Sequence, residues 1–441
     1  MTIRKRIPKH ISLETRTDLP ADFELSEEFS SVFDTIENTG RSIFLTGKAG
    51  TGKSTFIQYF RQKTRKNIVV LAPTGVAAIK ARGQTIHSFF RLPPRFIQEE
   101  HIKRLRNSDT MRRVDTIVID EASMIRADIL DGIDRSLRVN RGRYDEPFGG
   151  VQMVLIGDLF QLPPVVDREM SGIMSQRYDT PYFFSANVLK DTGIRCFELT
   201  KIYRQKSMAF INILNKIRIR DITERDIDII NTRCRAQEEK DGVVTLTVTN
   251  IQAKNINDAK LGELENDEYG YEAEVTGKFD RSAYPADHDI RLKKGAQVIL
   301  IKNDPQKRWV NGTLGEIYNV FRDKIEIRIE GEIYELKKEK WENISYIYDR
   351  DTDKIEEEVT GSFSQYPLKL AWAITIHKSQ GQTFSRVNID VGRGAFAHGQ
   401  VYVALSRCRD LDGITLTRPI SARDIIFDER VYEFMDGAVR G

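Results

Sequence analysis

The sequence predicts an α/β protein with two parallel-sheet domains and a small antiparallel β-barrel inserted in the second. Continuous apolar runs alternate with helical patterns in two parts of the chain, which is typical of parallel strands covered on both faces. Between them, residues 306–366 contain short segments of alternating polarity bounded by Gly and Asp turns. The length of 441 residues also exceeds what one ordinary hydrophobic core accommodates.

The first domain is expected at residues 1–190. It begins with an apolar helical stripe, after which four apolar runs alternate with turns and helical patterns. The stripe comprises Leu25, Phe29, Val32, Phe33 and Ile36 and ends before Gly40, and the runs are residues 43–45, 68–71, 116–119 and 153–156. Each run is expected to form one strand of a parallel sheet.

The second domain is expected at residues 191–305 and 367–441, on either side of the inserted barrel. Its strands are predicted at residues 197–199, 243–249 and 298–301, and the pattern resumes at Ala371.

Composition narrows the function classes only slightly. The 68 basic and 65 acidic residues leave a net charge of +3, which does not demonstrate a basic groove. Cys196, Cys234 and Cys408 lie far apart without a CxxC pair, so we expect small buried side chains and no disulfide framework or zinc site. No run approaches the roughly 18 apolar residues of a membrane helix. The basic first residues also lack the apolar run of a secretion signal.

A phosphate-binding loop is predicted at residues 47–54, GKAGTGKS, a complete match to GxxxxGK[ST]. It lies between a predicted strand and a helical pattern, where backbone N–H groups surround phosphates at a helix N-terminus. Lys53 is expected to reach the β- and γ-phosphates and Ser54 to bind Mg²⁺. The residues expected to bind the nucleotide are Gly47, Gly50, Thr51, Gly52, Lys53, Ser54 and Thr55.

Polar residues follow the next strands. Asp120 is predicted to hold the Mg²⁺ shell and Glu121 to act as the base that polarises the attacking water, since this acidic pair follows the phosphate loop. Gln161, in GDLFQLPP, is either a sensor of the γ-phosphate or part of a Pro-terminated turn. Arg204 and Arg407 are candidates for guanidinium groups that stabilise the transferring phosphoryl group across a domain cleft, although the local pattern alone fits surface arginines.

The ordered motifs GKAGTGKST, LAPTGVAA, GQTIHSFF, IVIDEASM, GDLFQLPPV, LTKIYRQ, AWAITIHKSQGQTF and YVALSRCR extend from Gly47 to Arg409. This set resembles superfamily-one, B-group helicases of the PIF type, and residues 127–138 resemble that family's signature segment. RecD-type and phage Dda-type helicases share the general order. The resemblance implies two RecA-like P-loop domains with parallel sheets and an SH3-like β-barrel insertion. It also implies ATP and Mg²⁺ as cofactors and 5′-to-3′ unwinding.

The resemblance also assigns residue roles. Gln161 becomes the γ-phosphate sensor, Arg204 and Arg407 become arginine fingers, and Gly381 joins the residues near the nucleotide. Single-stranded DNA is expected at Pro73, Thr74, Thr85, His87, His377, Lys378 and Ser379. A short wedge that meets the duplex is expected within residues 88–110, at Leu92 and Pro93. The family often has an adenine-reading glutamine where this chain has Phe29, so Phe29 is predicted equally to stack on a base or to join the core.

Local physics leaves several of these DNA contacts open. Hydroxyl, imidazole and aromatic groups grip single strands through phosphates and stacking, but the same residues also form strand ends and helix caps. Lys302 and Asn311, on either side of residues 303–310, fit a DNA contact or an edge and a turn equally well. The wedge residues fit a rigid loop as well.

The sequence therefore predicts an ATP-dependent DNA helicase that acts on single-stranded and forked DNA, and by resemblance on four-stranded G-rich DNA, in replication, repair, recombination or telomere maintenance. We expect a monomer that contacts replication or repair proteins and no membrane. It is expected in the cytoplasm with a bacterial or phage nucleoid, or in a eukaryotic nucleus or mitochondrion. The alternatives are an ATP-switched single-strand clamp without productive unwinding, favoured if Leu92 and Pro93 are packed inside, and a RecD-type motor subunit of a nuclease complex.

Overall fold

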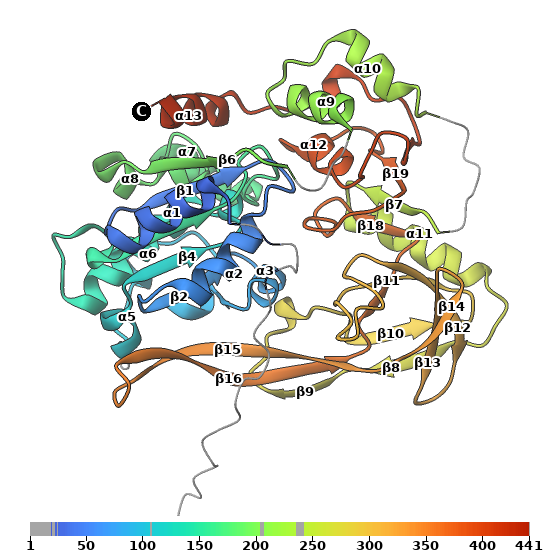
Figure 1. Ribbon diagram of the computed structural model, residues 1–441, viewed down its shortest axis with the longest axis horizontal. Coiled ribbons are helices and arrows are strands. Elements are labelled where there is room, and N and C mark those ends of the chain that lie inside the picture. The colour runs from blue at the N-terminus through green and yellow to red at the C-terminus, as the bar shows by residue number, and fades with distance from the viewer. Residues whose placement is uncertain are drawn as a thin grey trace, which may run out of the picture.

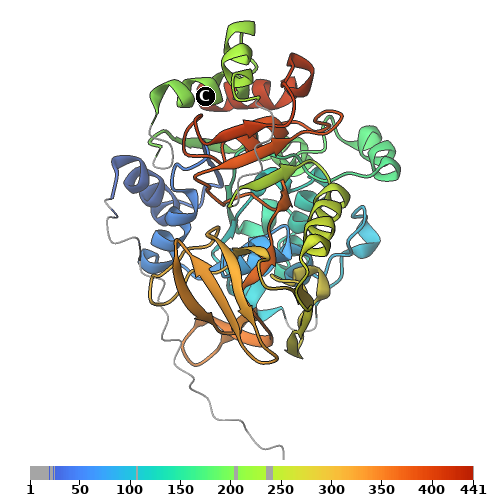
Figure 2. The same cartoon turned by 90° about the vertical axis from the view of Figure 1, so that its right-hand side faces the viewer.

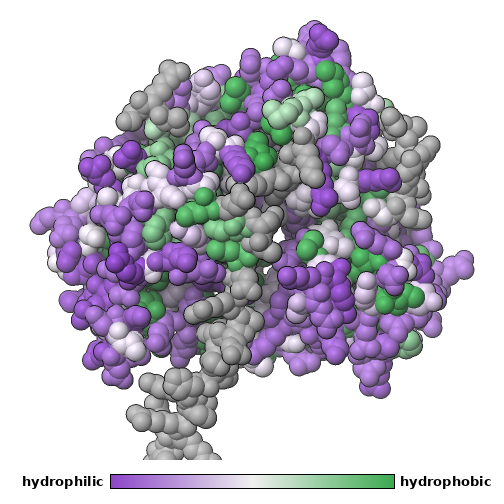
Figure 3. Space-filling model, viewed as in Figure 1, coloured by the Kyte–Doolittle hydropathy of each residue, from purple (hydrophilic) through white to green (hydrophobic). Residues whose placement is uncertain are grey.

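The computed structural model describes residues 19, 23, 25–105, 108–202, 207–234 and 242–440. Two α/β domains lie beside each other, and a β-rich insertion lies beneath both (Figure 1). A view turned by 90° shows the insertion below the second domain's strands (Figure 2). The face drawn in Figure 3 is mostly hydrophilic where it is described, with hydrophobic residues in small groups. Among the described residues, no helix is both long and apolar enough to cross a membrane.

The first domain contains a six-stranded parallel sheet in the order β3-β2-β4-β5-β1-β6. Its strands are β1 (Ile43–Gly47), β2 (Ile68–Ala72), β3 (Gln84–Thr85), β4 (Thr116–Ile119), β5 (Gln152–Ile156) and β6 (Arg195–Leu199). The four predicted apolar runs are confirmed as β1, β2, β4 and β5, which are almost wholly buried. Helices cover both faces, so these strands read as continuous apolar runs.

The helices of this domain are α1 (Glu27–Asn38), α2 (Lys53–Lys63), α3 (Gly75–Lys80), α4 (Ile86–Phe90), α5 (Asp109–Arg113), α6 (Ala127–Arg141), α7 (Arg168–Arg177) and α8 (Asn187–Thr192). Its short 3-10 helices are η1 (Glu99–His101), η2 (Ala122–Met124), η3 (Pro147–Gly150) and η4 (Phe183–Ser185). Two more lie later in the chain: η5 (Arg281–Ala283) and η6 (Ala422–Asp424).

Helix α1 forms the predicted apolar stripe. Ser26 caps its N-terminus by accepting a hydrogen bond from the N–H of Phe29 at 3.2 Å. Phe29 is 4% exposed, and its ring packs edge-on against Phe56 of α2 at a centroid distance of 5.4 Å. Of the two roles predicted for Phe29, its burial supports the core role and does not support its assignment to the nucleotide site. Leu25, which precedes the helix, is exposed.

The second domain contains the parallel sheet β18-β7-β19-β20. Its strands are β7 (Val244–Thr247), β18 (Ala373–Thr375), β19 (Val387–Asp390) and β20 (Ile414–Leu416), and its helices are α9 (Met208–Arg218), α10 (Glu224–Asn231), α11 (Asn250–Glu263) and α12 (Gln400–Leu405). The predicted strand at residues 197–199 lies instead in the first domain, because β6 pairs in parallel with β1. The first sheet therefore extends past the predicted boundary at residue 190.

The insertion is antiparallel, as expected, but larger than residues 306–366. Its strands are β8 (Tyr269–Glu272), β9 (Glu274–Gly277), β10 (Asp289–Leu292), β11 (Gln297–Leu300), β12 (Leu314–Val320), β13 (Ile325–Ile329), β14 (Glu332–Leu336), β15 (Glu339–Asp349), β16 (Lys354–Gln365) and β17 (Leu368–Leu370). They form the sheets β14-β13-β12-β11-β17, β15-β16-β9 and β10-β8. The run at residues 298–301, predicted as a second-domain strand, therefore belongs to the insertion through its antiparallel partners.

Two later segments return to the first domain (Figure 1). The long hairpin β15–β16 places the hydroxyl of Tyr346 3.2 Å from both the N and the O of Val70 in β2. Helix α13 (Glu429–Arg440) packs against β6, and its Val431 and Met435 are buried in the same apolar cluster as Phe44 of β1. Residues distant in sequence thus complete the first domain.

Candidate functional site

The phosphate-binding loop lies between β1 and α2, as predicted. Gly50 and Gly52 adopt φ angles of +85° and +89°, a left-handed conformation that favours glycine. The first turn of α2 has no side-chain cap, which leaves its N–H groups available to phosphate oxygens. The ammonium of Lys53 donates to the carbonyl oxygens of Gly47, at 2.6 Å, and of Lys48, at 3.1 Å. Ser54 is exposed at the start of the helix.

The acidic pair lies at the end of β4. Glu121 adopts the left-handed conformation, with φ +52° and ψ +44°, which costs a non-glycine residue on the order of 1–3 kcal/mol and is common at functional sites. Burial and the neighbouring carboxylate of Glu121 raise the pKa of Asp120 to about 6. Two crowded carboxylates near Lys53 are oxygen ligands that suit a hard divalent cation, as is the hydroxyl of Ser54, the residue after Lys53, so these residues fit Mg²⁺.

The charges of these groups converge on Lys53. Burial lowers the pKa of Lys53, and the carboxylates of Asp158, Glu121 and Asp120 oppose that change. The structure therefore brings together the predicted lysine and acidic pair, and it adds Asp158, which the sequence analysis quoted in the motif GDLFQLPP without a role.

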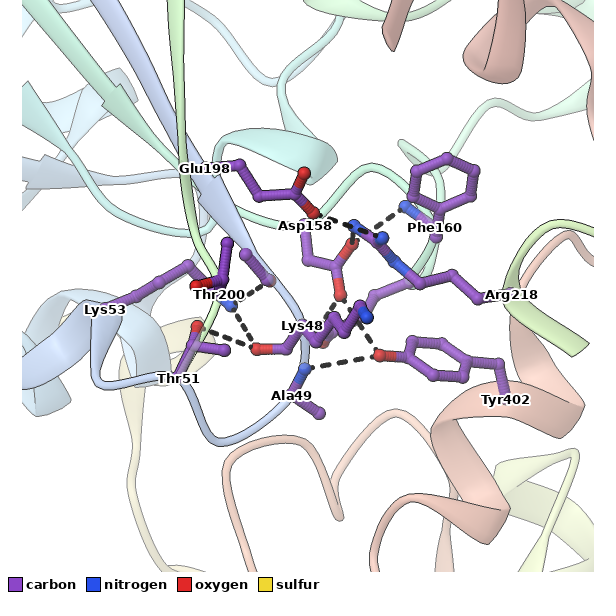
Figure 4. Close-up of polar contacts among 12 residues, drawn as sticks. Lys48, Ala49, Thr51, Lys53, Asp158, Phe160, Glu198, Thr200, Arg218 and Tyr402 are labelled. Carbon is purple, nitrogen blue, oxygen red and sulfur yellow. Dashed lines mark hydrogen bonds and ion pairs between the residues drawn. The ribbon is translucent and has the colours of Figure 1, made fainter. Parts of the chain in front are cut away.

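Asp158 connects the phosphate loop to the second domain (Figure 4). It is 1% exposed, and its Oδ2 accepts a hydrogen bond from the amide nitrogen of Gln161 at 3.2 Å. Its Oδ1 lies 3.3 Å from Nη2 of Arg218 in α9. The hydroxyl of Tyr402 in α12 lies 3.5 Å from Oδ2 and accepts a hydrogen bond from the N–H of Ala49 at 3.2 Å.

Arg218 is a site residue that sequence reasoning missed. It is 7% exposed, pairs also with Glu198 of β6 at 3.4 Å, and its guanidinium lies 4.2 Å above the Phe160 ring. A signal for it exists in the sequence. Arg218 follows Leu214 by four positions, on the buried stripe of α9, where the helical period calls for an apolar residue.

The two predicted arginine fingers have different outcomes. Arg407 is 1% exposed and is directed into its own domain, where Nε donates to the Val403 carbonyl at 2.9 Å and Nη2 to the Ser406 hydroxyl at 2.8 Å. In this arrangement it lies within the second domain and not across the cleft. Arg204 lies outside the described residues.

The predicted DNA residues of the first domain lie at helix starts. Thr74 and Thr85 cap α3 and α4 by accepting N–H groups at 3.2 Å, and Pro73 is half-buried beside them. The Nδ1 of His87 lies 3.2 Å from the carbonyl oxygen of Leu92. Burial lowers the pKa of His87, which favours its neutral imidazole.

The predicted DNA residues of the second domain and the insertion divide into accessible and inaccessible ones. Lys378 is exposed and His377 is half-buried, and burial lowers the pKa of His377. Ser379 is fully buried, and its hydroxyl donates to the Ile376 carbonyl at 2.7 Å, so its predicted DNA contact is not supported. Lys302 pairs with Glu339 at 2.7 Å. Asn311 lies in an exposed turn, as does Gly381, which was predicted near the nucleotide and not as a DNA contact.

The exposed tip of the wedge loop is not formed by the residues predicted for it, Leu92 and Pro93. Leu92 is 5% exposed and packs in the first domain's core, so it anchors the loop. Pro93 is half-buried, and Pro94 and Arg95 are exposed. Residues at the N-terminal end of α6 fix the position of this loop.

Two contacts hold that loop. Asp128 accepts the N–H of Ile97 at 2.9 Å, and it also forms a buried ion pair with Arg126 at 2.8 Å. Arg126 in turn donates to the carbonyl of Arg95 at 3.0 Å.

A phosphate-binding loop at the junction of two α/β domains defines a P-loop nucleotide-hydrolysing protein of the two-domain type. A family model described as PIF1-like helicase matches residues 24–228. The chain is 33% identical over 425 residues to the ATP-dependent DNA helicase Pif1 of Bdellovibrio bacteriovorus, covering 94% of this chain and 92% of that one. It is 32% identical to human PIF1, over 95% of this chain and 64% of that one. The chain belongs to the PIF1-like helicases.

Solved structures support the same assignment. The fold matches Bacteroides sp. Pif1 in complex with ADP-AlF4 with a TM-score of 0.87 at 39% identity, covering 94% of this chain and 97% of that one. The match to Bacteroides Pif1 bound to single-stranded DNA has a TM-score of 0.69 at 40% identity and the same coverage. The predicted pair of RecA-like domains and the predicted family are thereby confirmed. The chain spans less than two thirds of the Xenopus laevis and human relatives, at 62% and 64% of their lengths.

Proposed function

We propose that the protein hydrolyses ATP·Mg²⁺ and uses the free energy to translocate 5′ to 3′ on single-stranded DNA and to unwind duplex and four-stranded G-rich DNA. The observation that carries the proposal is the position of Asp158, which faces Lys53 of the phosphate loop from one side and Arg218 of the second domain from the other. A nucleotide at this loop acts on both domains at once. Nucleotide exchange therefore changes the contact between them.

Each first-domain group has a defined task in this proposal. Lys53 and the N–H groups of α2 bind the phosphates, and Ser54 and Asp120 hold Mg²⁺. Bound Mg²⁺ neutralises the charge that develops on the phosphoryl oxygens. Glu121 takes the proton of the attacking water, and Gln161 contacts the γ-phosphate. Arg407, which lies inside the second domain in this arrangement, and Arg204 are assigned to stabilise the transferring phosphoryl group once the cleft closes.

DNA binding is supported by solved structures of Bacteroides Pif1 with single-stranded DNA and with forked double-stranded DNA. In this chain, helix starts at Thr74 and Thr85 offer backbone N–H groups to phosphates, and Lys378 offers an exposed cation from the second domain. One grip therefore lies on each domain, and alternating their strength as the cleft opens and closes moves the protein along the strand. Roles in replication, repair, recombination and telomere maintenance, and a place beside the chromosome, follow the family.

The test is strand separation on two duplexes, one with a 5′ single-stranded tail and one with a 3′ tail, with ATP·Mg²⁺ present. We expect unwinding of the 5′-tailed duplex alone. Lys53→Ala should abolish unwinding because the phosphates lose their cation, while single-strand binding persists. Glu121→Gln serves as a hydrolysis-deficient control. Unwinding by Lys53→Ala would contradict the proposed mechanism.

The burial of Leu92 favours a second candidate, the ATP-switched clamp, because a buried leucine cannot enter a fork. The same experiment separates the two. DNA-stimulated ATP hydrolysis without unwinding of either duplex would support the clamp. Unwinding of the 5′-tailed duplex by wild-type protein would instead contradict the clamp, and unwinding by Pro94→Gly as well would show that splitting does not need the proline at the exposed tip.

A further inference from the structure

We propose that Arg218 is a positioning residue of the second domain that orients Gln161 through Asp158. The contact makes the γ-phosphate sensor of the first domain depend on where the second domain lies. This inference deepens the proposed function and rests on its ATP hydrolysis step alone. It does not require unwinding.

The first step of the argument is a continuous chain of contacts across the cleft. Nη2 of Arg218 lies 3.3 Å from Oδ1 of Asp158, and Oδ2 of the same carboxylate accepts the side-chain amide of Gln161 at 3.2 Å. The turn that carries Gln161 is further fixed because the Oδ1 of Asp158 accepts the N–H of Phe160 at 3.2 Å (Figure 4). The orientation of the glutamine is thus set by a carboxylate whose own partner belongs to the other domain.

The second step is that this carboxylate needs Arg218. Asp158 is 1% exposed, and a buried carboxylate requires an opposite charge and hydrogen bonds to remain ionised. Its pKa is lowered in spite of burial, because Arg218 and Lys53 both favour the ionised form. A phosphate that binds Lys53 weakens the stabilisation that Lys53 gives to the Asp158 carboxylate. After nucleotide binding, the carboxylate is therefore stabilised mainly by Arg218, and the contact between the domains becomes stronger.

The third step is that neighbouring residues hold the Arg218 side chain in place while one of its N–H donors stays unused. Its Cζ lies 4.2 Å from the centroid of the Phe160 ring, and its Nη1 pairs with Glu198 at 3.4 Å. Its buried Nε has no hydrogen-bond partner among the described residues. A buried donor without a partner loses its hydrogen bond to water and gains none in return, which is unfavourable. The side chain therefore gains when a small displacement of the second domain lets this N–H meet an acceptor.

The experiment measures DNA-stimulated ATP hydrolysis of purified full chains at saturating single-stranded DNA. We expect Arg218→Ala to lower kcat by about 10²-fold, the effect of misplacing a catalytic group by about 1 Å, with KM for ATP within about threefold. Arg218→Lys should recover about tenfold of that loss, because lysine restores one charge but not the forked contact to two carboxylates. Arg225→Ala, an exposed arginine of α10, is the matched control and should leave kcat unchanged.

A second comparison excludes a merely structural role. Gln161→Ala removes the side chain that Arg218 is proposed to orient, so adding Arg218→Ala to it should lower kcat by less than about threefold more. Two full, multiplied losses would overturn the inference, as would wild-type kcat in Arg218→Ala. If Arg218→Ala does not fold, as judged by thermal unfolding, Arg218→Lys alone and with Gln161→Ala supplies the same comparison.

Unwinding of the 5′-tailed duplex by wild-type protein is measured on the same samples. Its absence alongside normal ATP hydrolysis would overturn the proposed function and leave the result for Arg218 intact. Wild-type unwinding together with an unaffected Arg218→Ala would overturn only the inference.

Discussion

The two α/β domains meet in two chemically different places. At the nucleotide cleft the contact is ionic and buried, with Arg218 between Asp158 and Glu198. The C-terminal helix α13, which follows the second domain in the chain and docks on the first, makes an apolar contact instead, in which Phe434 stacks on Phe184 of the first domain at a ring-centroid distance of 4.4 Å. Apolar contact is non-directional and does not depend on bound ligands, whereas a buried ion pair is directional and responds to each added charge. The helix is therefore suited to hold the domains together and the cleft to switch.

Breaking the ionic contact should have the largest effect on stability. Asp158→Ala removes the charge that compensates buried Arg218 and should lower the free energy of unfolding by about 3–5 kcal/mol. Urea denaturation measures this change. Asp412→Ala, whose carboxylate is 92% exposed although paired with Arg233, is the control and should leave the urea midpoint in place. A change as small as that of Asp412→Ala would show that the cleft contact stores no stability.

Breaking the apolar contact should affect stability without affecting turnover. Phe434→Ala should cost about 2–3 kcal/mol, less than a fully buried phenylalanine, because the ring is only partly buried. The kcat of ATP hydrolysis at 25 °C should stay at the wild-type value, since this helix packs on β6 and on the apolar cluster around Phe44. A loss of kcat comparable to that of Arg218→Ala would erase the functional distinction between the two contacts.

A substitution in the acidic pair should change the free energy of unfolding by less and in the opposite direction, so that it stabilises the protein. The pKa of Asp120 is raised from 3.8 to about 6, so between these values the folded protein holds a proton that the unfolded chain has lost. The stability contributed by that proton is full below pH 3.8 and is lost as the pH rises through about 6. Asp120→Asn should therefore raise the free energy of unfolding by about 2 kcal/mol at pH 8 and by little at pH 4, while abolishing ATP hydrolysis. Urea denaturation at both pH values checks this, and equal gains at the two values would contradict it.

Local sequence patterns predicted the first sheet and the phosphate loop because both depend on short-range rules. Strands β1, β2, β4 and β5 are buried on both faces and so are apolar at every position, and the loop is defined by its glycines and lysine. The sequence did not assign β6 to the correct domain, because an apolar run does not specify which sheet it joins. The pairing of β6 with β1 is a tertiary contact.

Side-chain burial was predictable only where periodicity decides it. Phe29 lies on a helical stripe, and the stripe's core role won over nucleotide stacking. Leu92 lies between an arginine and two prolines, which resembles an exposed loop, and its burial depends on packing against the first domain's core cluster. Arg218 occupies an apolar register position, but its partner Asp158 is 60 residues away, and sequence alone does not connect them.

The return of residues 339–365 and 429–440 to the first domain has a consequence for how the chain folds as it is made. Strands β1 to β6 are synthesised first. The hydrogen bond between the Val70 carbonyl and Tyr346 forms only after residue 346 has been made, and the cluster around Phe44 is complete only after Val431 and Met435 have been made. Contacts between such distant residues are slow to form, and an apolar surface left open meanwhile is prone to aggregation. A growing chain of this protein therefore carries an unfinished first domain on the ribosome until residues 429–440 emerge, and chaperones that bind apolar surface have that interval in which to act.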